Sequence, residues 1–78
     1  MIAITGASGQ LGRLVIRYLL ERIPADQVVA LVRNPGKAQD LVELGVTLRR
    51  ADYNEPETFT DALKGVDKLL LISSNEAG

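Results

Sequence analysis

Three glycines within eight residues constrain what this chain can fold into more than any other feature. Gly6, Gly9 and Gly12 lie in the segment TGASGQLG, between a short β-branched run and a stretch of apolar residues at helical spacing. Glycine weakens both strands and helices, so a cluster of glycines marks the loop that joins them. Such a loop is typical of a βαβ unit that approaches a phosphate group, and a plain structural turn is the alternative.

Strand and helix patterns alternate along the rest of the chain. Short apolar runs predict strands over residues 2–5, 28–32, 46–50 and 68–73, and helical patterns cover residues 10–23, 37–44 and 54–64. This alternation predicts an α/β fold. We expect a Rossmann-like parallel sheet in the strand order 3-2-1-4, with helices on both faces and right-handed crossovers, that stops after the fourth strand.

Local signals suggest where the helices begin and end. Pro24 is expected to end the first helix, whose apolar face includes Tyr18. Asn54 and Glu57 have the spacing of a capping box at the start of the third helix. Residues 1–78 contain no linker or low-complexity segment, so we expect all of them to belong to one domain.

Composition excludes several functional classes. The 78 residues have a net charge of −1, which gives no electrostatic footprint for nucleic acid or an anionic membrane. No apolar run approaches the roughly 20 residues needed to cross a bilayer, and the first residues do not resemble a signal peptide. Cysteine and histidine are both absent, which removes the commonest metal ligands and the commonest general base. We therefore assign no metal site and expect a cytoplasmic location.

Each glycine of the cluster has an expected role in a dinucleotide-binding loop. Gly6 would turn the chain off the first strand, Gly9 would let the backbone approach a pyrophosphate, and Gly12 would let the helix pack closely on the sheet. The phosphates would lie at the helix N-terminus, where free N–H groups favour an anion. The predicted loop site comprises Gly6, Ala7, Ser8, Gly9, Gln10, Leu11 and Gly12.

Four segments together resemble the NmrA-like group of atypical short-chain dehydrogenases, and within it the bacterial type-2 NADPH:quinone oxidoreductases. These segments are MIAITGASGQLG, VVALVRNPGKA, ADYNEP and LLLISSNE. The resemblance covers essentially the whole chain but only the amino-terminal part of such proteins. It implies that residues 1–78 are the N-terminal part of an NAD(P)-binding Rossmann domain, without the substrate region.

Arg33 indicates which nicotinamide cofactor the loop would serve. NAD sites usually place an acidic residue at the end of the second strand, whereas here Arg33 follows that strand and can pair with the 2′-phosphate of NADP. The nearest acid, Asp26, precedes the strand, and Lys37 adds positive charge in the following turn. We therefore predict NADP (NADPH) over NAD, and in the family that this chain resembles the corresponding arginine selects NADPH. A solvated arginine at a strand end is the alternative.

The resemblance also implies further cofactor contacts. Asp52 matches the family's acid near the adenine, and Tyr53 flanks the same pocket. Left to itself, Asp52 would equally serve as a turn-former before a helix. Ser73, Ser74 and Asn75 end the fourth expected strand, where the family places the nicotinamide half of the cofactor. Polar capping of a strand end is the alternative for these three residues.

No catalytic residue is assigned from the sequence. The Tyr-x-x-x-Lys pair of short-chain dehydrogenases is absent, because Arg22 follows Tyr18 and Glu57 follows Tyr53 at that spacing. Three functions therefore remain open. The chain could be the NADPH-binding portion of an enzyme that passes hydride to a quinone, or an NADP-binding redox-sensing regulator without catalysis. It could also be an inactive folding fragment that self-associates through an exposed sheet edge.

Overall fold

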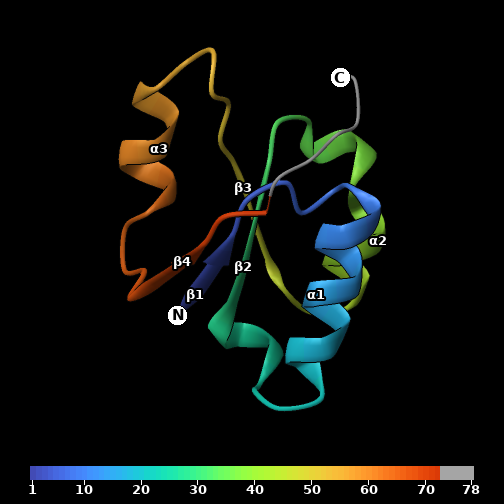
Figure 1. Ribbon diagram of the computed structural model, residues 1–78. Coiled ribbons are helices and arrows are strands. Elements are labelled where there is room, and N and C mark those ends of the chain that lie inside the picture. The colour runs from blue at the N-terminus through green and yellow to red at the C-terminus, as the bar shows by residue number, and fades with distance from the viewer. Residues whose placement is uncertain (73–78) are drawn as a thin grey trace.

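A four-stranded parallel sheet in the order β3-β2-β1-β4 forms the centre of the molecule (Figure 1). The structure is a computed structural model, and it describes residues 1–72. Its strands are β1 (Ile2–Ile4), β2 (Val28–Val32), β3 (Thr47–Arg50) and β4 (Lys68–Leu70). The predicted strand order and the parallel pairing of neighbouring strands are confirmed. The fourth strand is shorter than predicted and ends at Leu70.

Burial separates the two inner strands from the edges of the sheet. All five residues of β2 are buried, as expected for a strand that pairs on both sides and is covered on both faces. β1 pairs with β2 and with β4, so that Ile2 lies opposite both Val28 and Lys68. Because β1 is an inner strand, the loop that follows it leaves the sheet at the carboxyl end of the central strands.

Helices cover both faces of the sheet, as predicted (Figure 1). One face carries α1 (Gln10–Leu20) and α2 (Gln39–Glu43), and the other carries α3 (Glu57–Ala62). Two short 3-10 helices, η1 (Ala25–Gln27) and η2 (Pro35–Lys37), flank β2 in the chain.

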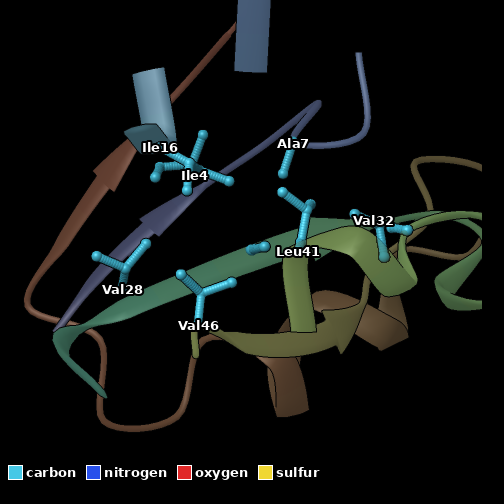
Figure 2. Packing of buried hydrophobic residues seen from close by; sticks show 9 residues of the cluster. Ile4, Ala7, Ile16, Val28, Val32, Leu41 and Val46 are labelled. Atoms are coloured by element: carbon cyan, nitrogen blue, oxygen red, sulfur yellow. The ribbon is translucent and has the colours of Figure 1, made fainter. Parts of the chain in front are cut away.

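Two apolar clusters, one on each face, hold these layers together. The larger joins Ile4, Ile16, Leu41 and the valines of β2 that point toward α1 and α2, and Figure 2 shows its members. The smaller cluster lies on the face covered by α3. Its members are Ala3, Val29, Leu31, Ala51, which follows β3, and Ala62 of α3.

The apolar face of α1 differs from the predicted one. The residues of α1 that are buried are Gly12 and Ile16, whereas Leu11, Leu14 and Tyr18 are exposed, Tyr18 with 55% of its surface accessible. The guanidinium of Arg22 lies 3.7 Å from the centre of the Tyr18 ring. The expectation that Tyr18 packs in the core was therefore wrong, because α1 packs on the core through Ile16, with Val15, Leu19 and Leu20 beside it.

The start of α3 also differs from the sequence prediction. Pro56 occupies the N-cap position, and Asn54 lies in a preceding turn where its N–H donates to the Asp52 carboxylate at 2.9 Å. The predicted capping box between Asn54 and Glu57 is therefore absent. Thr58 fixes the turn instead. Its hydroxyl group accepts a hydrogen bond from the Asp52 N–H at 2.8 Å and donates one to the Glu55 carbonyl oxygen at 2.7 Å.

We predict that a chain of these 78 residues self-associates through β4. Within residues 1–72, β4 pairs only with β1, and its three residues are exposed together with Leu71. An uncovered strand edge with exposed leucines is a template for pairing with a second copy. Sedimentation velocity should show a concentration-dependent shift to larger species, and Leu69→Lys with Leu71→Lys should suppress it.

The matched control for this association is Val42→Lys with Leu44→Lys, which places the same two charges on exposed apolar positions at the end of α2. It should leave the association unchanged. A monodisperse monomer at all accessible concentrations would contradict the prediction.

Candidate functional site

A cleft of about 420 Å³ opens at the carboxyl ends of the strands. Ligand sites in open parallel sheets lie in this position, and the volume falls within the usual range of roughly 300 to 1,000 Å³ for small-molecule pockets. Five segments line the cleft: the glycine loop, the end of β2, the turn after β3, α3, and the chain just beyond β4. The lining residues are Thr5, Gly6, Ser8, Gly9, Leu31, Val32, Arg33, Ala51, Asp52, Tyr53, Asn54, Phe59 and Ile72.

The glycine loop, residues 5–12, is shaped by Gly6 and Gly12. Gly6 has a φ of +61°, in the left-handed region that residues other than glycine rarely adopt. Gly12 lies under the loop, where a Cβ atom would come within 2.7 Å of the Ala7 Cα and closer still to the Gly6 carbonyl oxygen. The predicted role of Gly6 as the turn is confirmed. Gly12 permits a close approach as predicted, but its nearest neighbours are in the loop backbone itself.

Gly9 has a different environment from the other two glycines. It is the N-cap residue of α1, and its φ of −77° and ψ of 170° form an extended conformation that any residue adopts. Neither a turn nor backbone strain therefore explains why this position lacks a side chain. Gly9 lines the cleft, and the first turn of α1 contains no acidic residue. This arrangement leaves the positive end of the helix facing the cleft, where it would favour an anion.

Ala7 and Thr5 connect the glycine loop to its surroundings. Figure 2 shows the buried side chain of Ala7 pointing toward Leu41 of α2, and the Ala7 N–H donates to the Leu31 carbonyl at 3.4 Å. The Thr5 hydroxyl oxygen accepts the N–H of Ile72 at 3.0 Å. The floor of the cleft is thus tied to β2 on one side and to the end of β4 on the other.

Arg33 lies on the wall of the cleft, directly after β2. It is exposed, and its guanidinium has no hydrogen bond or ion pair with any other residue in the described range 1–72. A cation that is held on a cleft wall without an internal acceptor is available to an anionic ligand. Lys37 belongs to η2 and is exposed, and it does not line the cleft.

Asp52 and Tyr53 line the cleft from the turn after β3, the strand next to β2. One carboxylate oxygen of Asp52 accepts the Asn54 N–H, and the other lies 3.7 Å from Nη2 of Arg50. Asp52 therefore acts as a turn-former, which was one of the two expectations for it. The ring of Tyr53 packs on that of Phe59, with centroids 5.1 Å apart and planes inclined by 35°. An aromatic surface thus flanks the carboxylate.

The cleft brings together part of the residue set predicted from the sequence. Gly6, Ser8, Gly9, Arg33 and Asp52 line it, together with the flanking Tyr53. The predicted residues that do not line it are Ala7, Gln10, Leu11, Gly12 and Lys37. Ser73, Ser74 and Asn75 lie outside the described residues, so the structure does not test their predicted role.

Sequence reasoning missed Arg13, which has more side-chain hydrogen bonds than any cleft-lining residue described above. Its guanidinium binds the carboxylate of Asp40 on α2 through two N–H groups, each at 2.9 Å. These hydrogen bonds hold the pKa of Asp40 below its usual value. Nothing in the sequence pairs two residues so far apart, so no local signal could have found this contact.

Phe59 and Asn54 were also missed as lining residues. Phe59 lies at an apolar position of α3 that the helical pattern assigns to the core. Asn54 was interpreted as a helix cap.

Among residues 1–72, no group of three or more acidic, cysteine or histidine side chains could hold a metal ion. None of the helices in this range has the length and apolar character required to span a bilayer.

Comparison with known proteins gives consistent matches. A protein family described as NAD(P)H-binding matches residues 6–78. Quinone oxidoreductase 2 of Escherichia coli (strain K12) is 60% identical over 78 residues, which are 100% of this chain and 27% of that protein. The crystal structure of an NADPH-dependent quinone oxidoreductase of Escherichia coli, complexed with NADPH, superposes with a TM-score of 0.92 over 100% of this chain and 28% of that one.

A second solved structure shows a similar likeness. The triphenylmethane reductase of a Citrobacter species, complexed with NADP(H), is 53% identical with a TM-score of 0.92. The match covers 97% of this chain and 27% of the reductase. The chain thus spans about a quarter of the length of the proteins that it resembles.

Proposed function

Because this chain belongs to the NAD(P)H-binding family, we propose that its cleft binds NADPH within a quinone oxidoreductase that passes hydride from NADPH to a quinone. One observation carries the proposal: the glycine loop and Arg33 meet in a single cleft. The first suits a pyrophosphate and the second a 2′-phosphate, and these are the two anionic groups of NADPH. The Escherichia coli relative, named as NADPH-dependent and complexed with NADPH, supports this cofactor and substrate class.

The residues present fit this cofactor in three places. The backbone of Gly6, Ser8 and Gly9 would hold the pyrophosphate against the N-terminus of α1, where no side chain and no acidic group intervenes. Arg33 would pair with the 2′-phosphate, and the wall formed by Asp52 and Tyr53 would flank the adenine. The backbone of Gln10 and Leu11, in the first turn of α1, completes the proposed loop site. Ala7 and Gly12 support the loop from inside, since the Ala7 N–H is already bonded to the Leu31 carbonyl.

Bound NADPH supplies the hydride, so this part of the protein has to bind and orient the cofactor. Holding the reacting groups in place is a large part of such catalysis. Ser73, Ser74 and Asn75 remain our candidates for the nicotinamide end. The residues that hold the quinone would lie in the part of the relatives' length that this chain does not span.

Arg33→Ala should weaken NADPH binding about tenfold or more and change NADH binding much less. The guanidinium can donate two charge-assisted hydrogen bonds to the 2′-phosphate, and each such bond contributes roughly 1.5 to 3 kcal/mol. NADH offers only a hydroxyl at this position, so it gains little from the contact. Dissociation constants for both cofactors, measured by nicotinamide fluorescence at fixed low salt, test this expectation.

Arg33→Asp should reverse the cofactor preference, and Arg17→Ala on an exposed part of α1 is the matched control that should change neither affinity. An equal loss for both cofactors in Arg33→Ala would show that Arg33 is not the selector. Oxidation of NADPH in the presence of a quinone, measured on a protein of the relatives' full length that contains these 78 residues, tests the catalytic part of the proposal. Tight NADPH binding without turnover would favour a redox-sensing regulator.

A further inference from the structure

We propose that Arg13 is a positioning residue of the NADPH site, which fixes the glycine loop relative to the segment that carries Arg33 and thereby maintains the preference for NADPH over NADH. This inference rests on the proposed function, since it concerns the selectivity of the same cleft. Arg13 lies in the first turn of α1, directly after Gly12, and does not itself line the cleft.

One guanidinium connects three segments of the chain. Its Nε and Nη2 groups donate to the two carboxylate oxygens of Asp40 on α2, both at 2.9 Å. Its Nη1 group donates to the carbonyl oxygen of Ser8 in the glycine loop. Nη2 also lies 3.4 Å from the carbonyl oxygen of Lys37 at the end of η2. A rigid, forked donor is required for this pattern, and lysine could not reproduce it.

The anchored segment is continuous with the residue that we assign to the 2′-phosphate. Arg33 and Lys37 are separated by a single short turn in which the Asn34 side chain accepts the Gly36 N–H at 3.2 Å. Because this turn is short and internally bonded, a shift of η2 or α2 would move Arg33 with it. On the other side, Ser8 lies in the loop assigned to the pyrophosphate.

Arg13 thus adds a second link, beside the Ala7–Leu31 hydrogen bond, that holds the glycine loop at a fixed distance from Arg33. A bidentate arginine–phosphate contact depends strongly on geometry. In a variant without the Arg13 contacts to Ser8 and Asp40, the bond between Arg33 and the 2′-phosphate should therefore weaken strongly. The bonds between the glycine loop and the pyrophosphate should weaken less. NADPH would contact both the glycine loop and Arg33, whereas NADH would contact only the glycine loop. The affinity for NADPH should therefore fall more than the affinity for NADH.

The fold should tolerate removal of this link. The side chains of Arg13 and Asp40 are 31% and 52% exposed, and ion pairs at such exposure contribute little to the free energy of unfolding. The packing of Ala7 in the core and its hydrogen bond to Leu31 remain in place. Variants at positions 13 and 40 can therefore be compared as folded proteins.

The opposing hypothesis is that Arg13 is a direct ligand of the cofactor phosphates. The two roles differ in the effect of Asp40→Asn. If Arg13 positions the glycine loop and Arg33, loss of the carboxylate charge also weakens NADPH binding, though by no more than loss of Arg13, which bonds Ser8 and Lys37 as well. If Arg13 is a ligand that Asp40 holds back, the same substitution leaves NADPH binding unchanged or strengthens it.

The experiment measures dissociation constants for NADPH and NADH in the wild type, Arg13→Gln, Asp40→Asn and the double variant. We expect each single variant to reduce the NADPH preference about three- to tenfold. The double variant should lose no more than Arg13→Gln alone, because Asp40 acts through Arg13. Arg17→Gln, an exposed arginine on the same helix, is the control and should retain the full preference. Thermal melting should differ by only a few degrees among all variants.

Each result decides the proposal. Unchanged or tighter NADPH binding in Asp40→Asn overturns it in favour of a direct ligand. Equal losses for NADPH and NADH, with a lowered melting temperature, overturn it in favour of a purely structural role. A wild type that prefers NADPH, with the preference kept in both single variants, overturns this inference alone. A wild type without affinity for NADPH overturns the proposed function and this inference together.

Discussion

Gly12→Ala is expected to remove a large part of the free energy of unfolding of this protein. A methyl group at position 12 would lie 2.7 Å from the Ala7 Cα and nearer still to the Gly6 carbonyl oxygen. Both are backbone atoms, so no side-chain rotation can relieve the overlap. Overpacking of a core costs about 1 to 3 kcal/mol where side chains can adjust, and we expect at least the upper end of that range. A domain of this size has a total stability of roughly 4 to 12 kcal/mol.

The measurement for Gly12→Ala is thermal unfolding followed by far-UV circular dichroism. A loss of about 3 kcal/mol corresponds to a fall of roughly 12 to 24 °C in melting temperature for a domain of this length. Gly36→Ala is the matched control, because a Cβ there would meet only the Asn34 side chain, at 3.4 Å. A Gly12→Ala protein that melts with the wild type would show that the helix can move away from the loop at little cost.

Gly9→Val is expected to abolish NADPH binding while the fold persists. The backbone at position 9 is extended, so a valine fits its dihedral angles, but its side chain would occupy the cleft at the N-terminus of α1. A pyrophosphate displaced from this position would lose several charge-assisted hydrogen bonds of roughly 1.5 to 3 kcal/mol each. The affinity for NADPH should therefore fall by about a hundredfold or more.

Gly9→Ala provides a graded comparison for this prediction and should give an intermediate loss. Titration of nicotinamide fluorescence measures the affinity, and far-UV circular dichroism establishes that each variant is folded. Unlike Arg33→Ala, both substitutions should weaken NADPH and NADH alike, because the two cofactors share the pyrophosphate. Unaltered affinity in a folded Gly9→Val protein would reduce the glycine loop to a plain structural turn.

The sequence by itself determined the topology and the position of the loop. The continuous apolar run over 28–32 reads as a strand buried on both faces, and β2 occupies those five residues. Alternation of strands with helices leaves a parallel sheet with right-handed crossovers as the favoured arrangement, which is why the strand order could be predicted. Gly6 and Arg33 could be located for a related reason. In this topology the first loop and the end of the second strand necessarily meet at one edge of the sheet.

Only the tertiary structure decided what each side chain contacts. Helical periodicity placed Tyr18 on the apolar face of α1, but the helix packs on the core through Ile16 and its neighbours, which leaves Tyr18 facing outward. Spacing suggested a cap at Asn54, yet Asp52 and Thr58 hold that residue in a turn before the helix. In both cases a local pattern competes with contacts that exist only after packing, and the packing contacts prevail.

The link between Arg13 and Asp40 shows the same limit most clearly. The two residues are 27 positions apart in the chain, and neither lies in a pattern that distinguishes it from an ordinary exposed charge. They meet because the crossover places α2 beside the first turn of α1 on the same face of the sheet (Figure 1). Local patterns in a sequence report the dihedral angles and periodicity of neighbouring residues. Pairings between distant side chains depend on how the finished layers lie against one another, which only the tertiary structure supplies.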